Sequence, residues 1–502
     1  MEFEFKFQIP PGRLPAVEAA LRRGAVQRVH LQARYFDTAD GALAAHGMVL
    51  RLRKEGRRWV QTAKAAGAGP LQRLEHEVDL GAARAAASAV PDLRLHQGTA
   101  VGARLQQVLG AEPVLLETYG TDIWRQRRVV RVGRSMVELA LDVGQVNAPA
   151  VGGGRRVSPV CELELELVQG DAQALAGLAR RWAQRHGLWL STLSKAERGE
   201  RLRAGAGTVP AVKARAPEFP AQPSGRAIQQ AVLAACLAQV LPGASEVAAG
   251  NRDAEQLHQL RIGIRRLRTA LRALAPLAPG LDPAWEAPLV QVFRVLGTQR
   301  DREQALAAVQ PLLQAAGGPP VQWPAEDGAT AARPGEAVRT PAFQAVLIEL
   351  VGFAAAEAAA PGLDAAAARR ALRRQLRRLQ ARMLQDAARF TSLAPEAQHR
   401  TRRRLKRLRY LAEFAAPLWG KAKDAAAYLQ ALRPVQDLLG RQHDEAVACG
   451  LYRAAAMQDP RAWFGAGWLA ARQPEGARAC AEALGRIAGA APFWKKHGGK
   501  RS

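Results

Sequence analysis

The chain has 502 residues, more than one hydrophobic core usually supports, so we expect two or more domains. A formal net charge of +27 repels itself unless a polyanion or an acidic surface is nearby, which leaves nucleic acid, polyphosphate and anionic membrane as candidate partners. The four cysteines lack metal-ligand or redox spacing, no basic-then-apolar leader precedes the first strand, and no apolar run is long enough to span a bilayer, so we expect a cytoplasmic protein.

Residues 1–205 are predicted to be rich in strands. The opening segment MEFEFKF alternates charged and apolar residues, so Glu2, Glu4 and Lys6 share one face of a strand. The segments VQTAK, EHEVDL, WRQRRVVRV, SMVELALDV and VCELELEL have the same period of two. Between them, LPAVEAALRRG and DAQALAGLARRWAQRHG have helical periodicity, the second with Asp171 as its expected N-cap and Gly187 as its expected stop.

The charged faces of these strands carry like charges two or four residues apart. The basic pairs are Arg51/Arg53 and Arg125/Arg127, and the acidic groups are Glu75/Glu77, Glu138/Asp142 and Glu162/Glu164/Glu166. On an open, solvated sheet such pairs would repel, although the pattern alone leaves that arrangement open. A closed barrel with its apolar faces outward would line a water-filled tunnel with both signs of charge. Such a tunnel suits a polyphosphate with a bound divalent metal.

The segments that carry these charges occur in the order found in a known family. The ExExK pattern at residues 2–6 and the segments YFDTADGALAAHGMVLRLRK, VELALD, CELELEL and LSKAERG resemble the CYTH domains, the triphosphate tunnel metalloenzymes, over residues 1–200. The resemblance implies an eight-stranded antiparallel tunnel, dependence on Mg²⁺ or Mn²⁺, and hydrolysis or cyclisation at a triphosphate.

The same resemblance implies roles for individual residues. The implied phosphate ligands are Lys6, Arg51, Arg53, Lys64, Arg125 or Arg127, and Lys195. The implied metal ligands are Glu2, Glu4, Glu162 and Glu164, while Glu138 and Asp142 would assist with a second ion or the attacking water. Because Arg125 and Arg127 share one face of a strand, which of them corresponds to the family arginine stays open.

The remainder of the chain is predicted to be helical. Residues 206–223 contain four prolines and predict a linker between a domain at 1–205 and a domain at 224–495. From residue 224 onward the Ala-, Leu- and Arg-rich sequence has helical periodicity and no convincing strand. Residues 315–340 interrupt that periodicity and predict a long exposed loop.

The helical half contains two similar basic stripes. HQLRIGIRRLRTALR places His258, Arg261, Arg265 and Arg268 on one helix face, and HRTRRRLKRLRYLAEF repeats the arrangement with His399, Arg402, Lys406 and Arg409. LGTQRDREQALA is likewise echoed by LGRQHDEAVACG, which indicates an internal duplication. A further basic helix at 369–382 adds Arg370, Arg373, Arg374, Arg377 and Arg378. These segments resemble the CHAD domain, which implies two similar four-helix bundles whose basic faces bind inorganic polyphosphate.

The sequence thus favours an α+β tunnel domain followed by an all-α domain, acting together as a metal-dependent inorganic triphosphatase that binds polyphosphate. One alternative is a hydrolase or cyclase for an organic triphosphate such as thiamine triphosphate or ATP. Another is a non-enzymatic protein that binds polyphosphate or nucleic acid, although aromatic residues are only 5% of the chain and are not interleaved with basic ones. We expect no specific nucleic acid and no membrane as partners, and a homo-oligomer is compatible with the sequence.

Overall fold

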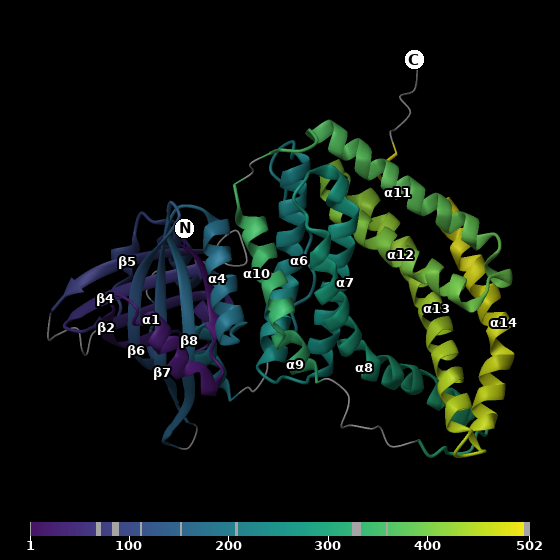
Figure 1. The fold of residues 1–502 in the computed structure, drawn as a ribbon, viewed down its shortest axis with the longest axis horizontal. Coiled ribbons are helices and arrows are strands. Elements are labelled where there is room, and N and C mark those ends of the chain that lie inside the picture. Colours follow the sequence, from purple (N-terminus) through teal and green to yellow (C-terminus); the bar gives the residue numbers. More distant parts are fainter. Residues whose placement is uncertain are drawn as a thin grey trace. The chain divides into compact units, whose positions relative to one another are not determined.

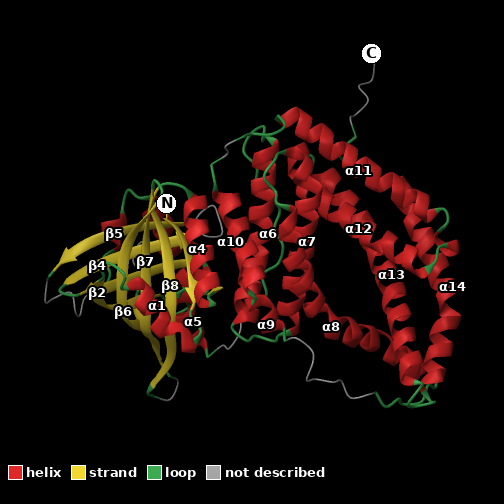
Figure 2. Cartoon of the chain, in the orientation of Figure 1, coloured by secondary structure: helices red, strands yellow, loops and turns green. Residues whose placement is uncertain are grey.

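The structure is a computed structural model that describes residues 2–66, 72–82, 90–110, 113–150, 153–205, 209–323, 333–357 and 360–495. Two compact units are interleaved along the chain. The first comprises Met1–Lys213, Leu237–Leu260 and Val338–Glu357, and the second Ala214–Cys236, Arg261–Ala337 and Ala358–Ser502. The predicted domain boundaries at 205 and 224 stay predictions. Within the described residues, strands occur before residue 191 and helices follow, which confirms the predicted order of the two structural classes (Figure 2).

The strands of the first unit close into an antiparallel barrel (Figure 1). They are β1 (Glu2–Gln8), β2 (Gln27–Asp37), β3 (Met48–Glu55), β4 (Arg58–Ala66), β5 (Gln72–Gly81), β6 (Leu116–Val132), β7 (Ser135–Pro149), β8 (Arg155–Gln169) and the short β9 (Trp189–Leu190). Their order is β5-β4-β3-β2-β6-β7-β8-β1, and β1 also pairs with β5, which closes a ring of eight. The expected eight-stranded tunnel is therefore confirmed, with β9 added alongside β1 as a ninth strand in the described sheet.

Helices cover the outward, apolar faces of this barrel. Alongside α1 (Leu14–Leu21), they are α2 (Ala42–Ala45), α3 (Ala100–Leu109), α4 (Ala172–His186) and α5 (Lys195–Ala204). Leu50 and Ala63 of neighbouring strands pack with Val101 and Leu105 of α3 in one buried cluster. Asp171 caps α4 by accepting a hydrogen bond from the Gln173 amide at 3.1 Å, and Gly187 ends it with φ of 66°. Both predicted helix boundaries of α4 are thus confirmed.

Helix α10 (Pro341–Ala355), from far along the sequence, packs on α4 within the first unit. A Cβ on Gly352 would lie 2.6 Å from the Ala176 Cβ, so the two helices approach as closely as glycine permits. The buried Gln344 side chain accepts a hydrogen bond from the Leu190 amide at 2.8 Å. The tunnel therefore takes part of its support from residues beyond the predicted linker.

We expect a fragment that ends at residue 205 to be less stable than the full chain. It would expose the α4 surface that α10 buries, and each large apolar side chain that loses its cover costs about 1.5–3 kcal/mol. Thermal unfolding of the purified fragment should begin well below the first transition of the full chain, with a tendency to aggregate.

Gln344→Ala in the full chain removes two buried hydrogen bonds of this region, the one that Gln344 accepts from the Leu190 amide and the one that it donates to the Val338 carbonyl at 2.6 Å. At about 1 kcal/mol for each bond, their joint loss should cost about 2 kcal/mol. If the fragment 1–205 unfolded at the same temperature as the first transition of the full chain, this result would contradict the supporting role of α10.

The later helices include two sets of four long ones. The first set is α6 (Gly225–Ala248), α7 (Ala254–Leu274), α8 (Glu286–Ala315) and α10, with the short α9 (Pro334–Arg339) before α10. The second set is α11 (Ala365–Ala387), α12 (Pro395–Ala415), α13 (Ala422–Ala455) and α14 (Ala462–Arg486). In the second set α11 packs on α12, α12 on α13, α13 on α14 and α11 on α14. The two basic stripes fall on α7 and α12, the second helix of each set, as the duplication predicts.

Two expectations about this half need correction. Helix α6 is long and apolar enough to cross a membrane by length and composition, whereas the sequence was expected to contain no such run; 72% of its most apolar window is buried in the structure, as in a core helix. The segment 315–340 is also not an exposed loop throughout. Helix α9 occupies part of it, Val338 is fully buried, and the Trp323 ring lies 4.8 Å from the Tyr452 ring. Residues 324–332 lie outside the described residues.

Candidate active site

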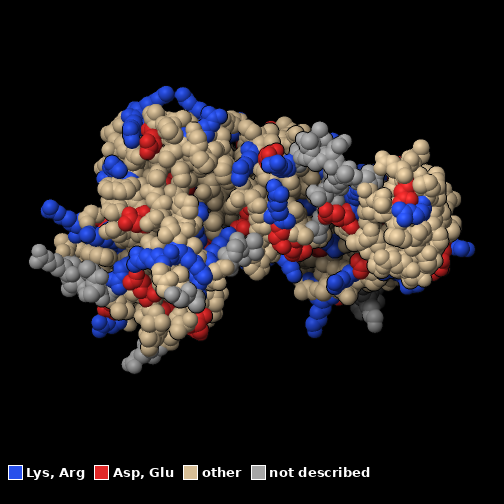
Figure 3. Space-filling model, turned by 90° about the horizontal axis from the view of Figure 1, so that it is seen from below, with Lys and Arg blue, Asp and Glu red and all other residues tan. Residues whose placement is uncertain are grey.

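A cavity of about 480 Å³ runs inside the barrel. Its described lining contains six carboxylates and six cationic side chains, with a few apolar residues and the Tyr35 and Ser194 hydroxyls at the edges. The carboxylates are Glu4, Glu75, Glu77, Asp142, Glu164 and Glu166, and the cations are Lys6, Arg51, Arg53, Lys64, Arg125 and Lys195. Acidic and basic side chains also lie side by side on the surface of this unit seen in Figure 3. The cavity therefore has the mixed charge that the alternating strands predict.

Strand register explains how like charges along each strand are tolerated. Across neighbouring strands, Lys6 lies opposite Glu164, Arg125 opposite Asp142, and Lys64 opposite Glu75. The Lys64 ammonium reaches the Glu75 carboxylate at 2.6 Å. Lateral attraction in these three pairs offsets part of the repulsion, although other carboxylates face each other across strands, as Glu4 does Glu166.

Three carboxylates gather at one wall of the cavity, and we call Asp142, Glu162 and Glu164 the acidic cluster. Carboxylate oxygens of the three lie within 4.8 Å of one another. Two cations hold them. Arg125 contacts Asp142 through two hydrogen bonds of 2.7 and 2.6 Å and Glu164 at 2.5 Å, while Lys195 lies 2.7 Å from Asp142, 2.9 Å from Glu164 and in contact with Glu162. Asp142 and Glu162 are fully buried, so this network is shielded from water.

Helix α5 brings Lys195 to the acidic cluster. Ser194 and Glu197 form a reciprocal capping box, which fixes the start of the helix at Lys195. Further along, Gly199 lies so close to Tyr119 of β6 that a Cβ would be 2.1 Å from the ring. The helix therefore packs tightly against the barrel, with its first side chain in the cavity.

Opposite charges in the cluster favour the charged forms of Glu164 and Lys195. Burial disfavours the ionised form of Glu164, but Lys195, Arg125 and Lys6 outweigh burial and hold the pKa of Glu164 well below its usual range. Burial likewise opposes the charge on Lys195, and Asp142, Glu162 and Glu164 nevertheless raise the pKa of Lys195 well above its usual range. Glu164 therefore remains anionic and Lys195 cationic at neutral pH.

A second group of cations lies on β3, with acidic partners on β5. Arg51 lies 3.6 Å and Arg53 3.3 Å from Glu77, which also accepts a hydrogen bond from the Thr62 hydroxyl at 3.1 Å. Burial, followed by the charge of Arg51, lowers the pKa of Arg53. Two adjacent guanidinium groups held by one carboxylate are suited to an anion with several negative oxygens.

The structure brings most of the predicted tunnel residues together but separates a few. Arg125 lines the cavity, whereas Arg127 is exposed and donates a hydrogen bond to Gln27 at 3.0 Å. Glu162 belongs to the acidic cluster without being among the cavity-lining residues, and neither is Glu138, which lies opposite Glu166 in the sheet. Glu2 opens β1, but its side chain lies outside the described part of the chain.

Six cavity-lining polar residues had received no role from the sequence. They are Tyr35, Glu75, Glu77, Thr121, Glu166 and Ser194. Periodicity had already placed the three glutamates on the charged faces of their strands, but it gave them no individual role. Tyr35 has no such signal, because it meets Arg51 only through the pairing of β2 with β3.

The acidic cluster has the donor chemistry that Mg²⁺ or Mn²⁺ requires. These hard cations prefer carboxylate oxygens, and three carboxylates converge here within coordinating range. Glu4, opposite Glu166 in the sheet, adds a further carboxylate to the cavity. The residues present therefore fit a divalent cation by type and proximity.

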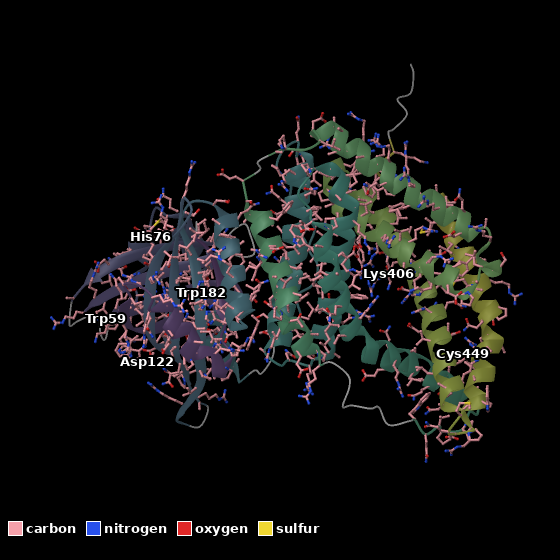
Figure 4. The ribbon with its side chains drawn as sticks, viewed as in Figure 1. Trp59, His76, Asp122, Trp182, Lys406 and Cys449 are labelled. Carbon is pink, nitrogen blue, oxygen red and sulfur yellow. The ribbon has the colours of Figure 1, made fainter. Side chains whose placement is uncertain are left out.

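A separate basic cluster lies in the second unit. Lys406 of α12, labelled in Figure 4, is half-buried and lies within the electrostatic influence of four arginines on α7 and α12. Burial, followed by the charges of Arg265, Arg402, Arg261 and Arg409, lowers the pKa of Lys406 to about 6. We call these five residues the basic cluster. So many neighbouring cations make this part of the chain a strong candidate for binding a polyanion.

Other members of the two stripes have different surroundings. Arg268 is held by Glu286 at 3.0 Å, and the guanidinium groups of Arg261 and Arg265 lie 4.7 and 5.0 Å from the centre of the Phe293 ring. His399 lies beside His443 of α13, with ring centres 4.7 Å apart and Nδ1 atoms 3.3 Å apart. His258 starts the α7 stripe one turn before Arg261.

Comparison with known proteins identifies two families. Residues 1–199 match the model of the CYTH domain, and residues 231–453 match that of the CHAD domain. An inorganic triphosphatase of Haemophilus influenzae is 27% identical over 208 residues, which cover 39% of this chain and 54% of that relative. The chain therefore spans about half the length of this curated relative.

Solved structures resemble each part separately. The CHAD domain of the plant Ricinus communis is 27% identical, covering 55% of this chain and 98% of its own, with a TM-score of 0.43. A Hippeastrum protein described as having a dominant triphosphatase activity is 19% identical, covering 42% of this chain and 98% of its own, with a TM-score of 0.30.

Proposed function

Because residues 1–199 belong to the CYTH domain family and residues 231–453 to the CHAD domain family, we propose that the chain hydrolyses inorganic triphosphate in its tunnel and binds polyphosphate through its helices. The observation that carries the first part is the cavity itself, which is lined by six carboxylates and six cations. The name of the Haemophilus influenzae relative supports the choice of inorganic triphosphate.

In this proposal the cations bind the substrate. Arg51 and Arg53 would hold oxygens of one phosphate group, since guanidinium groups bind such oxygens in pairs. Lys6, Lys64, Arg125 and Lys195 would bind the remaining oxygens from the other walls of the cavity. Arg127 takes no part, because it lies outside the cavity lining.

The carboxylates would hold the metal and position water. Glu2, Glu4, Glu162 and Glu164 are the proposed ligands of Mg²⁺ or Mn²⁺, which neutralises phosphate charge when bound. Water attacks the terminal phosphorus, its oxygen forms the new P–O bond, and the bond to the bridging oxygen breaks to release diphosphate. A carboxylate oxygen of Asp142, which lines the cavity, would orient the water and accept its proton, with Glu138 as the second proposed assistant.

The direct test is phosphate release from tripolyphosphate, ATP and thiamine triphosphate, each with Mg²⁺, Mn²⁺ or excess EDTA. We expect tripolyphosphate to be the best substrate by kcat/KM and EDTA to abolish turnover. Preference for ATP or thiamine triphosphate would favour the organic-triphosphate alternative. If the protein hydrolyses none of the three compounds, the alternative that it is a non-enzymatic binding protein would be favoured.

The helical half is proposed to bind inorganic polyphosphate through the basic cluster and the stripes that contain it, with His258 and His399 at their starts. The proposed location is the cytoplasm, with no specific nucleic acid and no membrane as partners.

A further inference from the structure

Lys195 occupies the position that a divalent cation would need in the acidic cluster. We propose that Lys195 acts as a tethered cation, which holds Asp142, Glu162 and Glu164 in the metal-free tunnel and must leave them before Mg²⁺ or Mn²⁺ binds there. This inference rests on the proposed function, in which Glu162 and Glu164 are metal ligands and Asp142 orients the attacking water at the same site.

The contacts of the ammonium group carry the argument. Lys195 Nζ lies 2.7 Å from Asp142 and 2.9 Å from Glu164, and it contacts Glu162 as well. An ammonium has three N–H donors, and three carboxylates take them up. A divalent cation that is coordinated by these carboxylates requires the same oxygens, and two cations at one position would repel strongly in a shielded cavity.

Lys195 can leave without disturbing the fold around it. It is the first residue of α5, whose start is fixed by Ser194 and Glu197 rather than by the lysine side chain. Its flexible four-carbon stem can swing toward the open part of the cavity. Arg125 differs, because its planar group makes two hydrogen bonds to Asp142 and a third contact to Glu164.

A polyphosphate in the cavity offers the ammonium new partners. When Lys195 moves to phosphate oxygens, the acidic cluster becomes available to the metal, so triphosphate and metal should bind cooperatively. Such coupling is reciprocal, because the factor by which the substrate increases the affinity for metal equals the factor by which the metal increases the affinity for substrate. The lysine thereby makes the tunnel take up metal together with its substrate.

The experiment measures Mn²⁺ affinity by calorimetry or electron paramagnetic resonance, without substrate. Lys195→Met removes the competing charge while keeping a similar stem. Lys6→Met is the matched control, because Lys6 lies opposite Glu164 and its charge also acts on Glu164. In the described structure the ion pairs of the acidic cluster involve Lys195 and Arg125, not Lys6. We expect Lys195→Met to tighten Mn²⁺ binding about tenfold or more, and Lys6→Met to tighten it by about threefold at most.

The second measurement repeats the titration with a non-hydrolysable triphosphate analogue. The analogue should tighten Mn²⁺ binding to the wild-type protein. In Lys195→Met, most of this effect of the analogue should be lost. Because the lysine variant leaves three carboxylates with Arg125 alone, its folding is checked by circular dichroism, and Mn²⁺ should raise its unfolding temperature more than that of the wild type.

Two outcomes would overturn the inference. If wild-type protein hydrolyses triphosphate with Mn²⁺ while Lys195→Met and Lys6→Met bind Mn²⁺ equally, Lys195 does not compete, yet the proposed function stands. If the wild type, with or without the analogue, and Lys195→Met all fail to bind Mn²⁺, both the competition and the proposed metal dependence are wrong.

Discussion

Glu164→Gln is expected to lower kcat for triphosphate hydrolysis by roughly 100-fold or more, while the barrel stays folded. Glu164, like Asp142, contacts both cations of the acidic cluster, with Arg125 at 2.5 Å and Lys195 at 2.9 Å. It lines the cavity and is a proposed metal ligand, so an amide there loses a charge that substrate-bound metal would need. Steady-state phosphate release with Mg²⁺ or Mn²⁺ measures the effect.

The matched control for this variant is Glu117→Gln. Glu117 also sits on a barrel strand and also pairs with an arginine, Arg34 at 2.7 Å, but it does not line the cavity. The Glu117→Gln variant should retain a nearly wild-type kcat. The structure provides a reason for the Glu164 variant to fold, since Arg125 and Lys195 keep Asp142 as a common partner. Wild-type turnover in Glu164→Gln at ordinary metal concentration would remove Glu164 from the proposed metal site.

The barrel could be predicted because the charge pattern of each charged strand is visible within its own short segment of sequence. Alternation in MEFEFKF and CELELEL defines β1 and β8 and assigns every side chain to a face, and like charges on one face argue for an enclosed, hydrated interior. The signals at the ends of α4 are equally local. Asp171 and Gly187 act through their own backbone, so their roles can be read without the rest of the fold.

Contacts between distant segments were not predictable in this way. The pairing of Lys195 with Asp142 and Glu162 depends on how α5 enters the barrel, and no spacing in the sequence encodes it. The distinction between Arg125 and Arg127 depends on where β6 leaves the cavity wall, although both share one strand face. The packing of α10 on α4 joins residues more than 150 positions apart. Periodicity predicts which side chains share a face of a strand or helix. These three features depend in addition on which faces pack against each other in the folded chain.

The basic cluster leads to the second large expected effect. Replacing Arg261, Arg265, Arg402 and Lys406 together by glutamine should weaken binding of long-chain polyphosphate by at least about 100-fold at low salt. These four side chains come from both α7 and α12, and the three arginines act electrostatically on Lys406, so a flexible polyanion would meet several cations at once. Each contact releases condensed counter-ions, and the wild-type affinity should therefore fall steeply with salt, with a shallower slope in the variant.

Helix α11 supplies a control in which four basic side chains are likewise replaced. Arg370, Arg374, Arg377 and Arg378 are four exposed arginines on one helix of the same unit, so their replacement removes four charges without touching the basic cluster. The proposal requires this variant to bind nearly as well as the wild type. Equal losses in the two quadruple variants would mean that the protein attracts polyphosphate only through its overall positive field.

The pH dependence of polyphosphate binding distinguishes a defined cluster from that overall field. Lys406 has a pKa lowered to about 6 by burial and by Arg265, Arg402, Arg261 and Arg409, so it is largely neutral at pH 7.5 in the absence of ligand. A bound polyanion favours the charged ammonium and would raise that pKa again. Binding should therefore take up a proton above pH 6, and affinity should increase as the pH falls from 8 toward 6. Calorimetry in buffers of different ionisation enthalpy measures this uptake, and Lys406→Met should abolish it while the four α11 replacements leave it intact. A proton uptake unchanged in Lys406→Met would place the polyphosphate elsewhere on the helices.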